Sequence, residues 1–214
     1  MHNLLNINLL IRCSEESLMQ VQIENTNETK NQKQHSQLKI SLRGDKEVVL
    51  KAVQSDGDAL EYASDALKDD KEIVLAAVKN SGFSLQHASL NLRSTKEICL
   101  AAVSNDGTAL EWVSSSLKFD SDIVNAAVQE NGHALEYASE DLKDDKNTVL
   151  LAIKQHGTAL EYASQRLKSD REVVLIAIQD DGWALEFISS ELRTDKEIVL
   201  MALEDNGYAL QHVL

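Results

Sequence analysis

Few residues of this sequence lie in arrangements that could do chemistry, and two histidines are the first to consider. His133 and His156 belong to neighbouring segments of similar sequence. Two imidazoles on adjacent elements could hold a transition metal, but protein metal sites such as those for zinc use three or four side-chain ligands. No cysteine and no third ligand at helical spacing accompany this pair. The sequence therefore predicts no metal site.

Paired carboxylates, glycines and serines are the other candidates. The Asp-Asp pairs at 69–70 and 144–145 resemble the start of a calcium loop, but the alternating oxygen ligands and central glycine of an EF-hand are missing. No glycines have the G-x-G-x-x-G spacing that cradles phosphate, and no serine lies in a nucleophile elbow. We predict a protein that is not an enzyme and has no cofactor. An enzyme with a site assembled across several segments is an alternative, less favoured than the two non-enzymatic functions given below.

The glycines instead mark an internal repeat. After residue 44 a glycine recurs every 25 residues without an insertion, at Gly57, Gly82, Gly107, Gly132, Gly157, Gly182 and Gly207. Before each glycine lies a segment like "DKEIVLAAVKNS" (70–81), and after it one like "ALEYASQRLK" (159–168). A fixed period of this length, held seven times, is typical of a repeat architecture. The chain also has no Pro, which favours helices.

Each unit is expected to form a helical hairpin. Apolar residues at i, i+3, i+4 and i+7 predict a helix A of about eleven residues before the glycine and a helix B of about nine after it. The glycine is expected to follow helix A in the left-handed conformation and turn the chain. One hairpin cannot bury its own apolar face, so the units must stack on one another. The predicted fold is all-α, an α-solenoid of seven 25-residue hairpins.

The domain boundaries follow from the repeat. Residues 35–214 are predicted to form the repeat domain, with a degenerate cap at 35–44 and the repeats at 45–214. Residues 1–34 are predicted to be an N-terminal cap segment followed by a polar linker. The sequence stops within the last helix B, which leaves an apolar end and suggests either self-association or a sequence cut from a longer chain.

Polar and aromatic residues recur at fixed places in the unit. A polar residue three positions before a Glu predicts a capping box, at Ser94, Ser169 and Thr194, and Asp69 imitates it. The fourth unit has Phe119 there, so Asp120 is expected to cap instead. An aromatic or His column on helix B is expected to pack between repeats: Tyr62, His87, Trp112, Tyr137, Tyr162, Phe187 and His212.

The motif quoted above resembles the repeats of the family known as domain of unknown function 4116. The resemblance covers residues 45–214. It implies a helical repeat and carries over no activity and no catalytic residue. The family occurs in protists, large viruses and some intracellular bacteria, so a host-directed role is open for a chain from an intracellular bacterium or a virus.

The turn between helices A and B is the candidate recognition surface. The position after each glycine varies in size and chemistry, and acids at the end of helix A oppose the helix dipole, so stability is not expected to require them. The alternative is that each post-glycine residue folds back onto helix B. The candidate ridge consists of Asp56, Phe83, Asp106, Glu130, His133, Asp180, Asp181, Trp183, Asp205 and Tyr208.

The net charge of the chain limits the classes of partner that we expect it to bind. The formal net charge is −14; residues 1–44 hold five Lys and Arg against four Asp and Glu, whereas residues 45–214 hold sixteen against thirty-one. An acidic body repels phosphate and anionic headgroups, so we expect neither nucleic acid nor membrane as a partner. Cys13 and Cys99 give no disulfide framework, which favours a reducing, cytoplasmic compartment.

These observations predict a non-enzymatic scaffold or adaptor. Its partner is expected to be a basic or amphipathic protein segment that docks on the candidate ridge. The second hypothesis is a structural element that assembles end to end through its C-terminal unit.

Overall fold

The protein is described by a computed structural model that places residues 41–213, and the predictions for residues 1–40 lie outside this range. The described residues are all-helical, with no strand. A main α-helix begins once every 25 residues and is eight to ten residues long, close to the predicted helix A. These helices are α3 (Lys46–Ser55), α5 (Lys71–Asn80), α6 (Lys96–Val103), α7 (Ser121–Glu130), α9 (Lys146–Ile153), α10 (Arg171–Asp180) and α11 (Lys196–Asp205).

The second arm of each unit differs from the predicted helix B. It is a short 3₁₀ helix that begins at the glycine. These helices are η2 (Gly57–Tyr62), η3 (Gly82–His87), η5 (Gly107–Trp112), η6 (Gly132–Tyr137), η7 (Gly157–Tyr162), η9 (Gly182–Glu186) and η11 (Gly207–His212). In most units an extended alanine or valine then ends the 3₁₀ helix; Ala163, for example, has φ −71° and ψ 158°. The prediction of one continuous helix of about nine residues was therefore wrong.

A short helical turn follows the extended residue in most units. The turns are α4 (Asp65–Lys68), η4 (Leu92–Ser94), α8 (Glu140–Lys143), η8 (Leu167–Ser169) and η10 (Leu192–Thr194). The helical spacing of Leu160, Ala163 and Leu167 was misleading because all three side chains are buried, although they come from three different local conformations.

A serine that follows the 3₁₀ helix connects neighbouring units through a backbone hydrogen bond. Ser164 donates its N–H to the carbonyl of Lys143 in the preceding unit, at 2.9 Å. The same bond recurs in the other units, from Ser64 to Arg43, Ser89 to Lys68, Ser114 to Arg93, Ser139 to Lys118 and Ser189 to Lys168. A continuous helix B could not make this bond, because its N–H groups would be used within the helix.

The glycines do not adopt the left-handed conformation that was predicted, since none of those described has a positive φ. Their role is close approach. A Cβ on Gly107 would lie 2.3 Å from the carbonyl oxygen of Ala127 in the next unit, and the other junctions are alike, at up to 2.5 Å. Only a residue without a side chain allows two units to come this close.

The N-caps of the α-helices lie one residue later than the capping boxes predicted. Asp70 and Asp170, rather than Asp69 and Ser169, accept hydrogen bonds from backbone N–H groups of the first turn. Asp120 was predicted to cap the unit that carries Phe119, and this is confirmed. Thr95 occupies the cap position of α6 without a capping hydrogen bond from the helix, and its hydroxyl instead donates to the carbonyl of Asn91.

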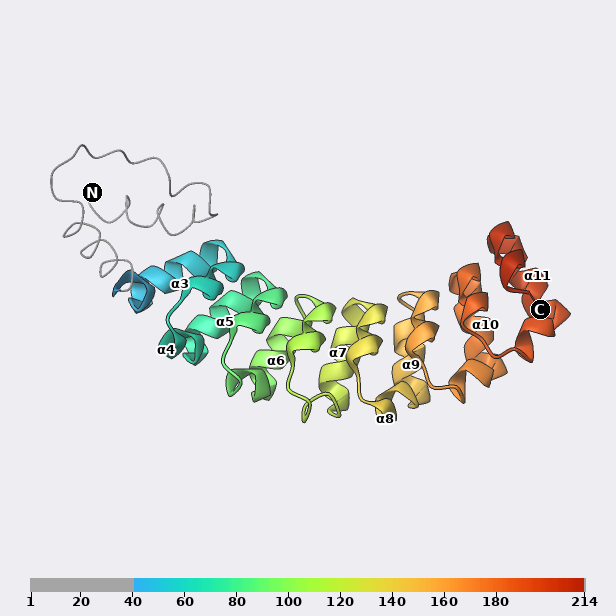
Figure 1. Ribbon diagram of the computed structural model, residues 1–214, viewed down its shortest axis with the longest axis horizontal. Coiled ribbons are helices and arrows are strands. Elements are labelled where there is room, and N and C mark those ends of the chain that lie inside the picture. Colours follow the sequence, from blue (N-terminus) through green and yellow to red (C-terminus); the bar gives the residue numbers. More distant parts are fainter. Residues whose placement is uncertain (1–40, 214) are drawn as a thin grey trace, which may run out of the picture.

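The units pack side by side around one continuous core. Each main α-helix contacts the helices before and after it, and the 3₁₀ helices do likewise. Ile73, Val74, Ala77 and Val78 on α5 are fully buried, as is Leu85 on η3; each large apolar side chain buried in this way contributes about 1.5–3 kcal/mol. The result is a curved row of units, with α4 and α8 along its outer edge (Figure 1).

Because each α-helix starts beside this outer edge, its C-terminal end points to the inner edge. The turns from α-helix to 3₁₀ helix, which carry the candidate ridge, therefore lie along the concave side of the row (Figure 1). No helix among residues 41–213 is both long and apolar enough to cross a membrane.

Candidate interaction surface

The inner edge is held together by hydrogen bonds from six of the repeat glycines, each to a side chain of the next unit. We call each such bond a glycine latch. The distance from the glycine nitrogen to the acceptor is 2.5–3.2 Å. The pairs are Gly57 to Asn80, Gly82 to Asn105, Gly107 to Glu130, Gly132 to His156, Gly157 to Asp180 and Gly182 to Asp205. Asn80, Asn105 and His156 were not predicted to be functional. The sequence does show that each of them lies one or two residues before a repeat glycine.

The acids of the candidate ridge therefore have structural roles. Glu130, Asp180 and Asp205 are latch acceptors. Asp56, Asp106 and Asp181 cap the 3₁₀ helices, accepting the N–H of Asp58, Thr108 and Trp183 at 2.9–3.0 Å. The expectation that stability does not require these acids was wrong. Their charge faces backbone N–H groups at the start of a 3₁₀ helix, where an anion is favourable.

The post-glycine rings of Phe83, His133 and Trp183 contact the next unit rather than folding back on their own. Phe83 meets Trp112 edge-on, with ring centroids 6.2 Å apart. Trp183 meets His212 in the same way at 5.6 Å. Both keep a free surface, since Phe83 is 40% and Trp183 37% exposed, and Tyr208 is 79% exposed. These rings are the apolar part of the candidate ridge that is exposed. Asp56, Glu130, Asp180 and Asp205 are exposed as well, although their carboxylates accept backbone hydrogen bonds.

The aromatic column packs between repeats, as expected. His133 meets Tyr162 across a junction, with ring centroids 6.2 Å apart. From the other side, a cation of the preceding unit lies over the ring in three junctions, at 5.7–6.0 Å from the centroid: Arg43 over Tyr62, Arg93 over Trp112 and Lys118 over Tyr137. The column thus belongs to the junctions, and its rings are half-buried.

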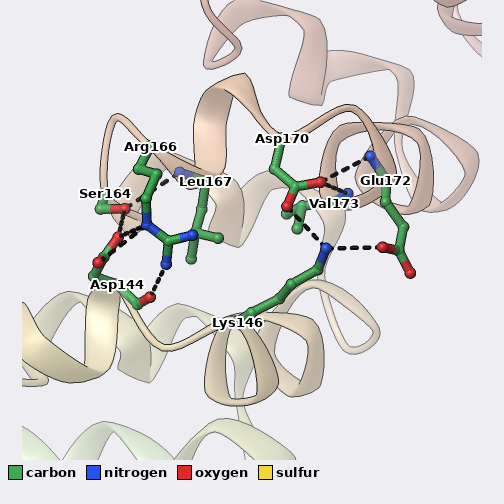
Figure 2. Close-up of polar contacts among 8 residues, drawn as sticks. All are labelled: Asp144, Lys146, Ser164, Arg166, Leu167, Asp170, Glu172 and Val173. Atoms are coloured by element: carbon green, nitrogen blue, oxygen red, sulfur yellow. Dashed lines mark hydrogen bonds and ion pairs between the residues drawn. The ribbon is translucent and has the colours of Figure 1, made fainter.

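Acids on the α-helical layer are paired with cations of the preceding unit. Lys146 on α9 reaches Asp170 and Glu172, both at 2.8 Å, while Asp144 accepts hydrogen bonds from Ser164 and Arg166 (Figure 2). The hydrogen bond from Lys146 is the main reason why the pKa of Asp170 lies below its usual value. Lys46 and Lys96 hold equivalent acids in the same way.

Acids on the 3₁₀ layer are not paired. Glu61, Glu111, Glu136 and Glu161 are exposed and occupy the same position of the first, third, fourth and fifth units, whereas the second unit has Gln86 there. Among residues 41–213 their carboxylates have neither an ion pair nor a hydrogen bond that neutralises them. Glu186, at the same position, is 3.8 Å from His212. We call these five residues the glutamate row.

The remaining sequence candidates for chemistry do not assemble into a site. No group of three His, Cys, Asp or Glu side chains within the described range could hold a metal ion. His133 and His156 do lie together, with ring centroids 4.7 Å apart. Cys99 is buried, and burial raises the pKa of its thiol to about 11, so it is a poor nucleophile at neutral pH.

Sequence comparison agrees with the period of the structure. The model of the family described as domain of unknown function DUF4116 matches residues 38–68, 45–93, 70–118, 120–168 and 170–214. The chain belongs to the DUF4116 family. Most of the DUF4116 matches begin within a residue of an N-cap aspartate, so the family unit starts where each α-helix starts. Neither a curated protein nor a solved structure matches the chain.

Proposed function

We propose that this protein is a non-enzymatic α-solenoid of seven hairpin-like units that binds a basic or amphipathic segment of another protein. The binding surface consists of the candidate ridge together with the glutamate row. The segment would run along several units, as partners of repeat proteins do on a concave surface.

The contrast between the two layers supports this proposal. The acids of the α-helical layer form ion pairs with lysine and arginine, whereas in the glutamate row only Glu186 has an ion-pair partner among residues 41–213, His212 at 3.8 Å. Free carboxylates beside partly exposed rings offer both charge and ring faces to a lysine or arginine side chain. The exposed rings Phe83 and Trp183 supply apolar contact on the neighbouring inner edge.

The proposal can be tested with a synthetic amphipathic peptide rich in Arg and Leu. Replacing Glu111, Glu136 and Glu161 with Gln removes three unpaired charges, and we expect affinity to fall about tenfold at low salt. Fluorescence anisotropy over a range of salt concentrations measures the effect. The ridge aspartates are unsuitable for this test, because Asp180 and Asp181 both accept backbone hydrogen bonds.

A matched control removes the same charge from the other layer. The variant Glu72→Gln, Asp122→Asn and Glu172→Gln alters residues that are paired with lysines. It should retain most of the affinity. An equal loss in both variants would mean that only net charge matters, and the proposed surface would be wrong.

We propose end-to-end self-association as a second candidate function, through the apolar face that contains Leu210. Leu210 is 62% exposed, whereas the equivalent Leu185 is fully buried. A Cβ on Gly207 would meet nothing within 4 Å, unlike the glycines of the preceding units. This face could accept another unit of the same kind, from a second copy or from a longer chain.

For this candidate, light scattering should show a mass that rises with protein concentration. Leu210→Glu should abolish the rise by placing a charge on the apolar face. Leu90→Glu is the matched control, because Leu90 is 77% exposed at a distance from this face. A constant monomer mass would exclude self-association.

A further inference from the structure

One glycine latch has a different chemistry from the rest. In five latches the acceptor is an amide or carboxylate oxygen. In the remaining one, Gly132 donates its N–H to Nδ1 of His156, at 3.2 Å. A ring nitrogen accepts a hydrogen bond only when it carries no proton. This latch alone can therefore be switched off by a proton near neutral pH.

A second imidazole stands beside the first. The rings of His133 and His156 have centroids 4.7 Å apart, and Nε2 of His133 is 3.2 Å from Oγ1 of Thr158. Burial, and next the neighbouring His156, lower the pKa of His133. A proton on His133 therefore faces a neighbouring imidazole and a partly buried site, both of which disfavour it.

The charged groups around the pair are few and partly engaged. Glu136 of η6 and Glu161 of η7 act to raise the pKa of His133, against the stronger effect of burial. From the adjacent helices, Glu130 of α7 accepts from Gly107, and Asp180 of α10 accepts from Gly157. Lys154, the residue directly after α9, is exposed.

We propose that the junction between α7 and α9 is an acid-sensitive hinge, in which protonation of His156 breaks the glycine latch and separates the two units at their inner edge. Because a protonated Nδ1 cannot accept a hydrogen bond, the latch is closed while the imidazole is neutral and opens when acid protonates it. The other latches, whose acceptors are amide or carboxylate oxygens, stay closed.

Amide hydrogen exchange at single residues tests the hinge in the whole chain. The protection factor of Gly132, corrected for the intrinsic effect of pH, should fall about fivefold or more between about pH 7.5 and about pH 5.5, as expected for the loss of one hydrogen bond. Gly82 is the internal control, because its acceptor Asn105 does not titrate. Equal behaviour of the two amides would overturn the proposal.

Two variants separate the hinge from a general effect of acid. Gln155→Asn with His156→Asn rebuilds the arrangement of neighbouring units, where Asn105 accepts from the glycine and Asn131 caps the 3₁₀ helix. The pH dependence at Gly132 should disappear. His133→Gln keeps His156 and should retain it. A pH dependence that survives the first variant, or that is lost only in the second, would show that His156 is not the switch.

Discussion

Single glycines set how closely neighbouring units approach. Each does so by lacking a side chain, since its backbone angles are ones that any residue adopts. At Gly107 the space that a Cβ would need contains the carbonyl of Ala127, at 2.3 Å, and the backbone nitrogen of Asn131, at 3.0 Å. Backbone atoms cannot rotate away as a side chain can. A methyl group here must push two units apart.

Alanine substitution at two glycines tests this explanation. Gly107→Ala should lower the free energy of unfolding by about 1–3 kcal/mol, because it overfills a packed junction. Gly207→Ala should change it by less than about 0.5 kcal/mol, since no atom lies near the added methyl. Urea unfolding of both variants measures the difference. Equal losses of unfolding free energy in both variants would mean that the backbone freedom of glycine, rather than the close approach of two units, explains the effect.

At the scale of elements, the short turns of the outer edge are joined by a carboxylate in some units and not in others. Asp69 accepts a hydrogen bond from the hydroxyl of Ser89, and Asp144 accepts one from Ser164. Phe119 replaces this aspartate in the fourth unit and is 61% exposed. The hydroxyl of Ser139, which should be its partner, is buried and has no hydrogen bond. This junction lacks the hydrogen bond that Asp69 and Asp144 make in their junctions.

Restoring the carboxylate should stabilise the protein. Phe119→Asp should raise the free energy of unfolding by about 1 kcal/mol, because the buried hydroxyl of Ser139 gains an acceptor. The Asp-Asp pair that results already occurs at residues 69–70 and 144–145. Chemical denaturation measures the gain, and Ser139→Ala in the same background should remove it. A gain that persists without the hydroxyl would contradict this explanation.

For the whole molecule, the repeat was the easiest property to predict. A period without insertions and a recurring apolar pattern fix where each α-helix starts, because units that stack must present the same face each time. The 3₁₀ arm could not be predicted in the same way. Its buried residues, such as Leu160 and Ala163, have helical spacing, and only the hydrogen bond to the preceding unit shows why the chain becomes extended between them.

The candidate surface was predictable in part. The variable residues after each glycine do lie on an open edge, and three of their rings are exposed. The acids beside them could not be assigned correctly from one unit alone, because Glu130 and Asp180 act on the glycine of the preceding unit. A hydrogen bond that forms only between two copies of a motif cannot be recognised from the sequence of one copy.

The glycine latch also limits how such a chain can change in length. Its donor and its acceptor are a fixed number of residues apart in almost every junction, and each joins only adjacent units. Losing or duplicating one full period would therefore recreate an ordinary junction at the splice, whereas any other insertion would misalign donor and acceptor along the inner edge. Lengthening by whole modules is the change that this architecture tolerates best.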